Sequence, residues 1–143
     1  MSTTLQRFHL AQGHGADSAY EQALAELRSG RKQGHWIWFV LPQLRGLGQS
    51  PTSQRYGIEN LAEAQAYLAD PLLRQRLEAV IEAIDHQVQQ PGQSLTLLMG
   101  GELDAAKTIS SLTLFCAAGL PAASILLDRL GSRCAVTESK LGR

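Results

Sequence analysis

The strongest constraint on the fold is a helical period that runs through residues 70–92. Apolar side chains recur there every three or four residues, as on the inward face of an amphipathic helix: Leu73, Leu77, Val80, Ile81, Ile84 and Val88. Asp70 is a favourable N-cap, and Pro71 takes the first helical position, where a missing N–H costs nothing. A proline and a glycine at 91–92 then stop the helix. We predict the longest helix of the chain between Pro71 and Gln89, with Leu77, Ile81 and Ile84 buried.

Capping signals mark two further helices before this one. Ser18 and Glu21 form a capping box, and the apolar side chains that follow share one face up to a glycine stop at residue 30. Asn60 and Glu63 repeat the same capping pattern. Both segments are therefore predicted to be helical.

The later part of the chain and the aromatic stretch are also interpreted as mainly helical. Residues 102–119 are apolar nearly all round, which is typical of a helix buried on most sides. A short turn is expected at 94–101, and Pro121 opens a final helix. The run WIWFVL at 36–41 suits a buried strand or a buried helix. Because a lone strand would have no partner, we predict a short helix or turn that Pro42 stops.

These elements predict an all-α fold, a single compact domain of about six or seven helices. The length of 143 residues fits one domain and is enough to bury a core without disulfides or metal ions. We place this domain at residues 1–131. Residues 132–143 show no clear period and are expected to form a C-terminal tail that can be flexible.

Composition excludes several classes of function. Thirteen basic and thirteen acidic side chains cancel, which argues against non-specific binding to nucleic acids. No run of about 20 apolar residues is present, and the N-terminus lacks the apolar core of a signal peptide, so we expect a cytoplasmic protein without a membrane segment. The two cysteines and four histidines show no metal-ligand spacing, and no cofactor motif occurs. No metal and no cofactor are therefore expected.

The stretch GRKQGHWIWFVLPQLRGLGQS at 30–50 is the first candidate site. Trp36 and Trp38 offer flat faces and indole N–H donors, and Lys32 adds a positive charge. His35 could act as a general acid or base, because an unperturbed histidine side chain changes its charge near neutral pH. Two glycines, Gly46 and Gly48, would let the backbone approach a ligand closely. The alternative is that the aromatic side chains simply anchor the core.

A polar stripe on the helix predicted at 102–119 is the second candidate site. Asp104, Lys107 and Ser111 share one face, with Ser110 at its edge. These groups either form an ion pair on a surface strip or make the wall of a pocket for an anionic or hydroxylated ligand. If they belong to a pocket, the stripe and the 30–50 stretch should meet in space.

The long central motif, with AEAQAYLADPLLRQRL and LDAAKTISSLTLF, resembles a bacterial family called domain of unknown function 1810, whose members are often labelled calpastatin. The resemblance spans roughly residues 5–131 and implies a mainly α-helical single domain. It implies no activity. One departure is Asp70, where family members often have histidine, so this position is interpreted as a helix cap.

The residues and the family motif together give one set of candidate ligand-binding residues: Lys32, His35, Trp36, Trp38, Gln43, Gly46, Gly48, Ser50, Tyr56, Asp104, Lys107, Ser110 and Ser111. His35 and Asp104 are the candidates for catalysis, although the sequence does not indicate whether the protein is an enzyme or in which oligomeric state it exists. The favoured hypothesis is a pocket for a small anionic ligand, nucleotide-like or ADP-ribose-like. The alternatives are a protein–protein interaction module that uses the aromatic segment 35–48, and a segment that is entirely core.

Overall fold

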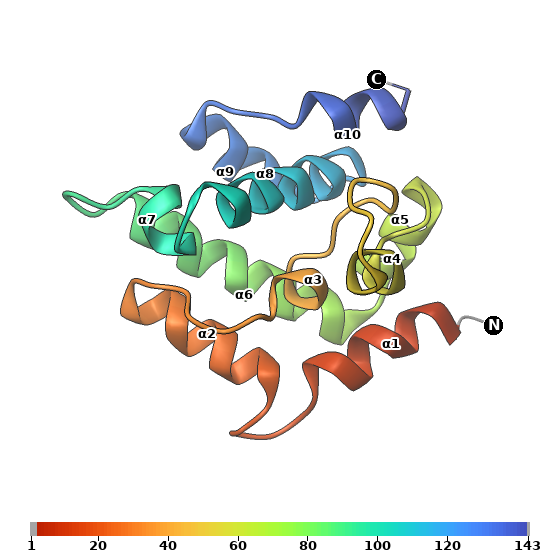
Figure 1. Ribbon diagram of the computed structural model, residues 1–143, viewed down its shortest axis with the longest axis horizontal. Helices are drawn as coiled ribbons and strands as arrows, with labels where there is room; N and C mark the ends of the chain where they lie inside the picture. The colour runs from red at the N-terminus through yellow and green to blue at the C-terminus, as the bar shows by residue number, and fades with distance from the viewer. Residues whose placement is uncertain (1–2, 143) are drawn as a thin grey trace.

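The computed structural model describes residues 3–142, and its regular structure is helical (Figure 1). Six of its ten helices have seven or more residues, and no strand occurs in this part of the chain, which confirms the all-α prediction. The helices are α1 (Thr3–Gln12), α2 (Ala19–Ser29), α3 (Ile37–Val40), α4 (Pro51–Tyr56), α5 (Leu61–Ala69), α6 (Pro71–Val88), α7 (Leu95–Met99), α8 (Glu102–Ala117), α9 (Pro121–Leu130) and α10 (Ala135–Lys140).

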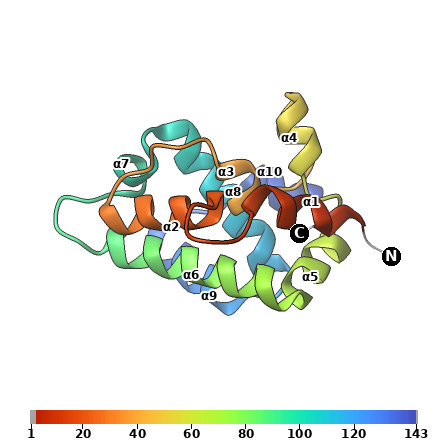
Figure 2. The same cartoon turned by 90° about the horizontal axis from the view of Figure 1, so that it is seen from below.

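The longest helix is α6, as its period predicts. The Asp70 carboxylate caps it by accepting hydrogen bonds from the backbone N–H groups of Leu72 at 3.1 Å and Leu73 at 3.0 Å. Leu77, Ile81 and Ile84 are buried. Helix α6 lies between α2 and α9, which the two views in Figures 1 and 2 both show. Its apolar face therefore organises the centre of the domain.

Local capping chemistry sets the bounds of the other predicted helices. Ser18 caps α2, which ends at Gly30 with φ at 100°, and Asn60 caps α5. Four helices were not predicted: α1, α4, α7, which is capped by Ser94 where we expected a turn, and α10. With six and five residues, α4 and α7 are too short to show a helical period, and α1 lacks a strong apolar stripe.

The aromatic stretch forms the short helix α3, in agreement with the prediction for residues 36–41. Beyond Pro42 the chain makes one parallel bridge, between Leu44 and Ile58. Its hydrogen bonds join Arg45 N to Ile58 O at 2.7 Å and Ile58 N to Gln43 O at 2.8 Å. This bridge fixes the loop after α3 against the chain that follows α4.

The residues after Gly131 contain a helix where we expected an irregular tail. Helix α10 lies against α8 (Figure 1), and the buried Thr137 hydroxyl is 3.1 Å from that of Ser110. The backbone N–H of Cys134 donates to Thr113 Oγ1 at 3.0 Å. The sequence alone did not reveal this helix because polar contacts with α8, rather than a long apolar period, hold it in place. Within residues 3–142, no helix combines the length and hydropathy that a membrane span needs.

Candidate functional site

The two polar regions of the sequence meet at Asp104, as the pocket hypothesis requires. Lys32 Nζ lies 2.8 Å from Asp104 Oδ2, and Lys107 Nζ lies 3.2 Å from Asp104 Oδ1. The Lys32 side chain is almost fully buried, with 6% of its surface exposed, whereas that of Lys107 is 29% exposed. One carboxylate on α8 therefore holds a lysine from the α2–α3 loop and a second lysine from its own helix.

This arrangement keeps Asp104 ionised. Burial raises the pKa of the Asp104 carboxyl, but hydrogen bonds and positive charge from Lys32 and Lys107 outweigh it, so the pKa lies below its ordinary value. Two ammonium groups share this carboxylate, and the nearby Glu26 carboxylate adds a second negative charge that acts on Lys32. Lys107, the more exposed of the two lysines, is placed to offer its positive charge to a ligand.

Trp36 belongs to the core rather than to an open site. Its indole is 3% exposed, and Lys32 Nζ lies 5.0 Å from the centre of its ring system. The Glu26 carboxylate on α2 accepts hydrogen bonds from Trp36 Nε1 at 2.8 Å and from the backbone N–H groups of Gln33 at 2.8 Å and Gly34 at 2.9 Å. Glu26 thus holds the loop that carries Lys32. Sequence reasoning missed it, because a single glutamate on an amphipathic helix carries no motif.

A cavity of about 120 Å³ lies beside this cluster, between α3, α4 and α8. Five of its lining residues belong to the candidate set from the sequence: Trp38, Gln43, Gly48, Tyr56 and Lys107. The remaining ones were not predicted: Leu44, Leu47, Ser53 and Gly57. Lys107 Nζ lies 4.4 Å from the centre of the Trp38 ring system, so the indole and Asp104 together hold this ammonium group at the cavity.

Gln43 is the unusual member of this lining. The residue is 9% exposed, and among the described residues no acceptor lies within hydrogen-bond distance of its buried Nε2 atom. Such a donor without an acceptor costs about 1–3 kcal/mol. Gln43, which carries this unsatisfied donor, lines the cavity together with the Lys107 cation, and this pairing suits a ligand rich in hydrogen-bond acceptors.

Close backbone approaches shape the wall opposite α8. A Cβ atom on Gly48 would come within 2.9 Å of the Ser53 Oγ atom, so only glycine allows the loop to approach α4 this closely. Ser53 donates to the Ser50 carbonyl at 2.8 Å, and the exposed Ser50 side chain caps α4. From α1, Arg7 donates to the carbonyl oxygens on either side of Tyr56, at 2.7 and 2.8 Å. These contacts fix the position of Tyr56 in the wall.

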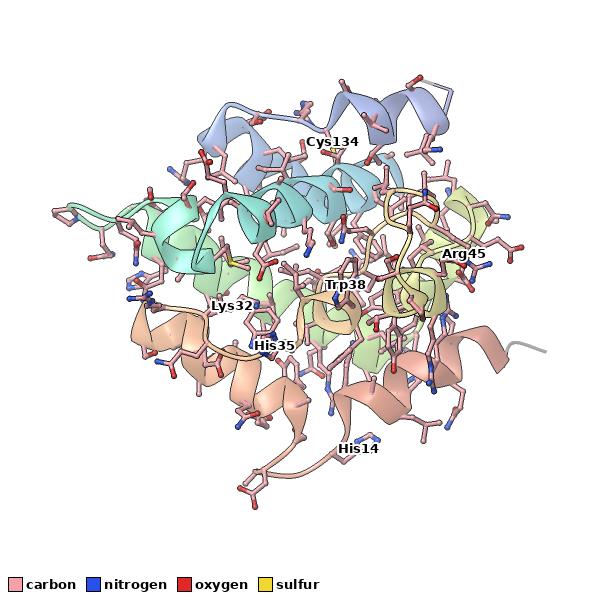
Figure 3. The ribbon with its side chains drawn as sticks, viewed as in Figure 1. His14, Lys32, His35, Trp38, Arg45 and Cys134 are labelled. Carbon is pink, nitrogen blue, oxygen red and sulfur yellow. The ribbon has the colours of Figure 1, made fainter. Side chains whose placement is uncertain are left out.

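The other candidates from the sequence do not line this cavity. His35 is exposed on the loop between α2 and α3, and Figure 3 shows it together with Lys32 and Trp38. Gly46 forms an exposed turn with φ at 99°. Ser110 faces α10, and the buried Ser111 hydroxyl has no hydrogen-bond partner within the part of the chain that the structure describes. Asp104 lies beside the cavity and acts through Lys107. Neither catalytic candidate, His35 nor Asp104, is among the lining residues.

Comparison with known proteins identifies two similarities. A family model described as "Protein of unknown function (DUF1810)" matches residues 2–135. The crystal structure of the conserved hypothetical protein Rv1873 from Mycobacterium tuberculosis is similar, with 40% sequence identity and a TM-score of 0.85. That similarity covers 97% of this chain and 96% of the other. Among curated proteins, none matches the chain.

Proposed function

We propose that this chain, which belongs to the DUF1810 family of proteins of unknown function, binds a small anionic ligand in the cavity between α3, α4 and α8. The observation that carries the proposal is the pairing of Lys107 with the unpartnered Nε2 of Gln43 in one cavity. A ligand oxygen that accepts from Gln43 while its charge faces Lys107 would satisfy both groups. Apolar walls from Leu44 and Leu47 would bury the rest of the bound group.

The size of the cavity limits what can enter it. Engineered protein cavities of about 150 Å³ bind benzene, and this cavity measures about 120 Å³. It therefore suits one small ring or one acid group, but not a complete nucleotide. For a nucleotide-like or ADP-ribose-like ligand, one end would enter the cavity and the rest would lie outside.

Burial favours this function over a protein–protein interaction module at 35–48. Among residues 5–142, the large apolar side chains that are strongly exposed all lie outside that segment: Leu10, Leu97, Leu103, Ile125 and Val136. An interface centred on the aromatic segment would need its rings on the outer surface. Trp36 is instead buried, and Trp38 lines the cavity beneath Lys107.

A ligand screen followed by two substitutions tests the proposal. Thermal-shift measurements with benzoate, nicotinate, nucleosides, nucleotides, sugar phosphates and ADP-ribose identify the probe that stabilises the fold most. A ligand at about 100 times its Kd adds roughly 2.7 kcal/mol of stability. Titration calorimetry then measures the Kd of that probe for the wild type and the variants.

Lys107→Met should weaken binding by about 2 kcal/mol, or roughly thirtyfold, because the ligand loses its charged partner. Gln43→Met should also weaken binding, yet leave the free protein as stable as the wild type or more stable, because an unpaired buried donor is removed. Trp36→Phe is the matched control, since it alters an aromatic side chain outside the cavity and should cost stability without changing the Kd. If Lys107→Met and Gln43→Met bind every probe as the wild type does, or if no probe in the screen binds, the cavity is not the site.

A further inference from the structure

We infer that the groove beside this cavity, between the loop after α3 and helix α10, is a second subsite that holds a phosphate group of the same ligand. The inference rests on the proposed function and extends it to a substrate class, a small ring that carries a phosphate. The groove encloses about 430 Å³ and is lined by Leu44, Arg45, Glu59, Asn60, Leu61, Lys140 and Leu141. Leu44 lines both hollows, so the cavity and the groove meet at this residue.

The charges of the groove are available to a ligand. Arg45 and Lys140 are both exposed, and within residues 3–142 neither lies within 4.0 Å of a carboxylate oxygen. Lys32 and Lys107 beside the cavity, in contrast, both contact Asp104. Among the described residues, the only carboxylate that lines the groove is that of Glu59. Its lining is therefore net positive, and a planar guanidinium next to an ammonium group suits the oxygens of a phosphate.

The fold brings the two cations together from distant parts of the chain. Arg45 follows α3 and is joined to Ile58 through the bridge described above, while Lys140 ends α10. Figure 1 shows the loop between α3 and α4 reaching the end of α10, and Figure 3 labels Arg45 on that side of the molecule. A Cβ atom on Gly46 would lie 3.7 Å from Lys140 Nζ, so the lysine rests against the turn. The hydrogen bonds of α10 to α8 hold this lysine at the groove.

The combined shape favours a phosphorylated ring compound over a simple acid. The cavity admits one ring, and the groove is wider, polar and open to solvent. A nucleoside monophosphate joins its ring to its phosphate through a sugar, which would span the place where the two hollows meet. A simple ring acid would fill the cavity and leave Arg45 and Lys140 without a partner.

Matched pairs of probes test the second subsite. Titration calorimetry at low ionic strength compares adenosine with AMP, and nicotinic acid riboside, whose ring carries a carboxylate for Lys107, with nicotinic acid mononucleotide. The phosphorylated member of at least one pair should bind at least about tenfold more tightly, and added salt should reduce that advantage. Arg45→Met and Lys140→Met should each weaken the phosphorylated probe about twofold to fivefold, as for an exposed charge, and leave the other probe unchanged.

Two further variants are included: one should tighten binding of the phosphorylated probe, and the other is a control for overall charge. Glu59→Gln removes the opposing carboxylate and should tighten binding of the phosphorylated probe. Arg31→Met makes the same change of net charge as Arg45→Met but lies outside the groove, and should have no effect at the same ionic strength.

The outcomes separate the two proposals. If the members of both pairs bind equally, or if neither pair binds, the phosphate subsite is overturned. Sensitivity to Arg31→Met equal to that of Arg45→Met also overturns it, because the effect then follows overall charge. Benzoate and nicotinate report on the cavity alone. If Lys107→Met loses binding of these two acids and Arg45→Met keeps it, the cavity remains supported as a ligand site even when the phosphate subsite is overturned.

Discussion

The ion cluster at Asp104 allows a quantitative test of how the candidate site is built. Asp104→Asn keeps the shape of the side chain but removes the charge that Lys32 Nζ contacts at 2.8 Å. Because the Lys32 side chain is only 6% exposed, its ammonium group would then be buried without a carboxylate in contact, although the Gly34 carbonyl still accepts its hydrogen bond and the Glu26 charge still acts on it. Breaking a fully buried ion pair in this way costs about 3–5 kcal/mol. Asp104 is 25% exposed, so solvent screening lowers the expected loss to roughly 2–3 kcal/mol.

Lys107 gives the matched comparison on the same carboxylate. Lys107→Met removes a contact of Asp104 at 3.2 Å and a cation–π contact with Trp38 at 4.4 Å. An exposed i,i+3 pair contributes about 0.2–0.5 kcal/mol, and a partly exposed cation–π contact about 0.5–1 kcal/mol. The expected loss is therefore about 0.7–1.5 kcal/mol, below that of Asp104→Asn. The buried lysine should matter for stability and the exposed one for binding.

Urea denaturation measures the free energy of unfolding of the wild type, Asp104→Asn, Lys107→Met, Lys32→Met and the Asp104→Asn/Lys32→Met double variant. The double variant should recover much of the loss, because replacing a whole buried ion pair by less polar groups is often close to neutral. Unchanged m-values would show that the folded state keeps its extent of burial. A loss below about 1 kcal/mol for Asp104→Asn, or a loss as large for Lys107→Met, would refute the assignment of Lys32 as the structural member of the cluster.

Two other predictions concern the core and the dependence on acid. Leu77 is 1% exposed on α6, so Leu77→Ala should lower the free energy of unfolding by about 2–5 kcal/mol, and a loss below about 0.5 kcal/mol in urea titration would contradict the packing described here. Burial raises the pKa of Asp70, but hydrogen bonds from Leu73 and His9 outweigh it, and the pKa of both Asp70 and Asp104 lies below the ordinary 3.8. A carboxyl group whose pKa is lower in the folded protein than in the unfolded chain stabilises the fold at pH values above its unfolded pKa, and this stabilisation is lost as the pH falls through its folded pKa. The free energy of unfolding should therefore decrease from about pH 5 downward. Asp70→Asn should be less stable than the wild type at pH 7, and its stability should depend less on acid.

Interactions between neighbours in the sequence made much of the fold predictable. The caps at Ser18, Asn60 and Asp70 act on N–H groups two or three residues away, and the apolar period of α6 reports which face is buried. Each of these features depends on positions within one or two helical turns. The sequence could therefore predict the long helices and their buried faces without knowing what packs against them.

The candidate site was predictable only in part. The two polar regions stood out because charged and aromatic side chains lay among apolar neighbours, and four of their candidate residues, with Tyr56 from the family motif, do line the cavity. Their roles could not be separated from the sequence. Trp36 and Trp38 look equivalent there, yet one is buried against Glu26 and the other lines the cavity with Lys107.

By itself, the sequence determined an all-α chain, the extent of its main helices and the two segments that carry polar chemistry. The tertiary structure decided which residues meet: Lys32 with Asp104, and Lys140 with the turn at Gly46. It also decided that Gln43 keeps an unpaired donor and that the final residues form α10. The physical reason is the separation in sequence over which each interaction acts. Capping and helical periodicity act along the chain, whereas burial, ion pairing and cavity shape arise between segments that are distant in sequence, and no local pattern encodes which segments those are.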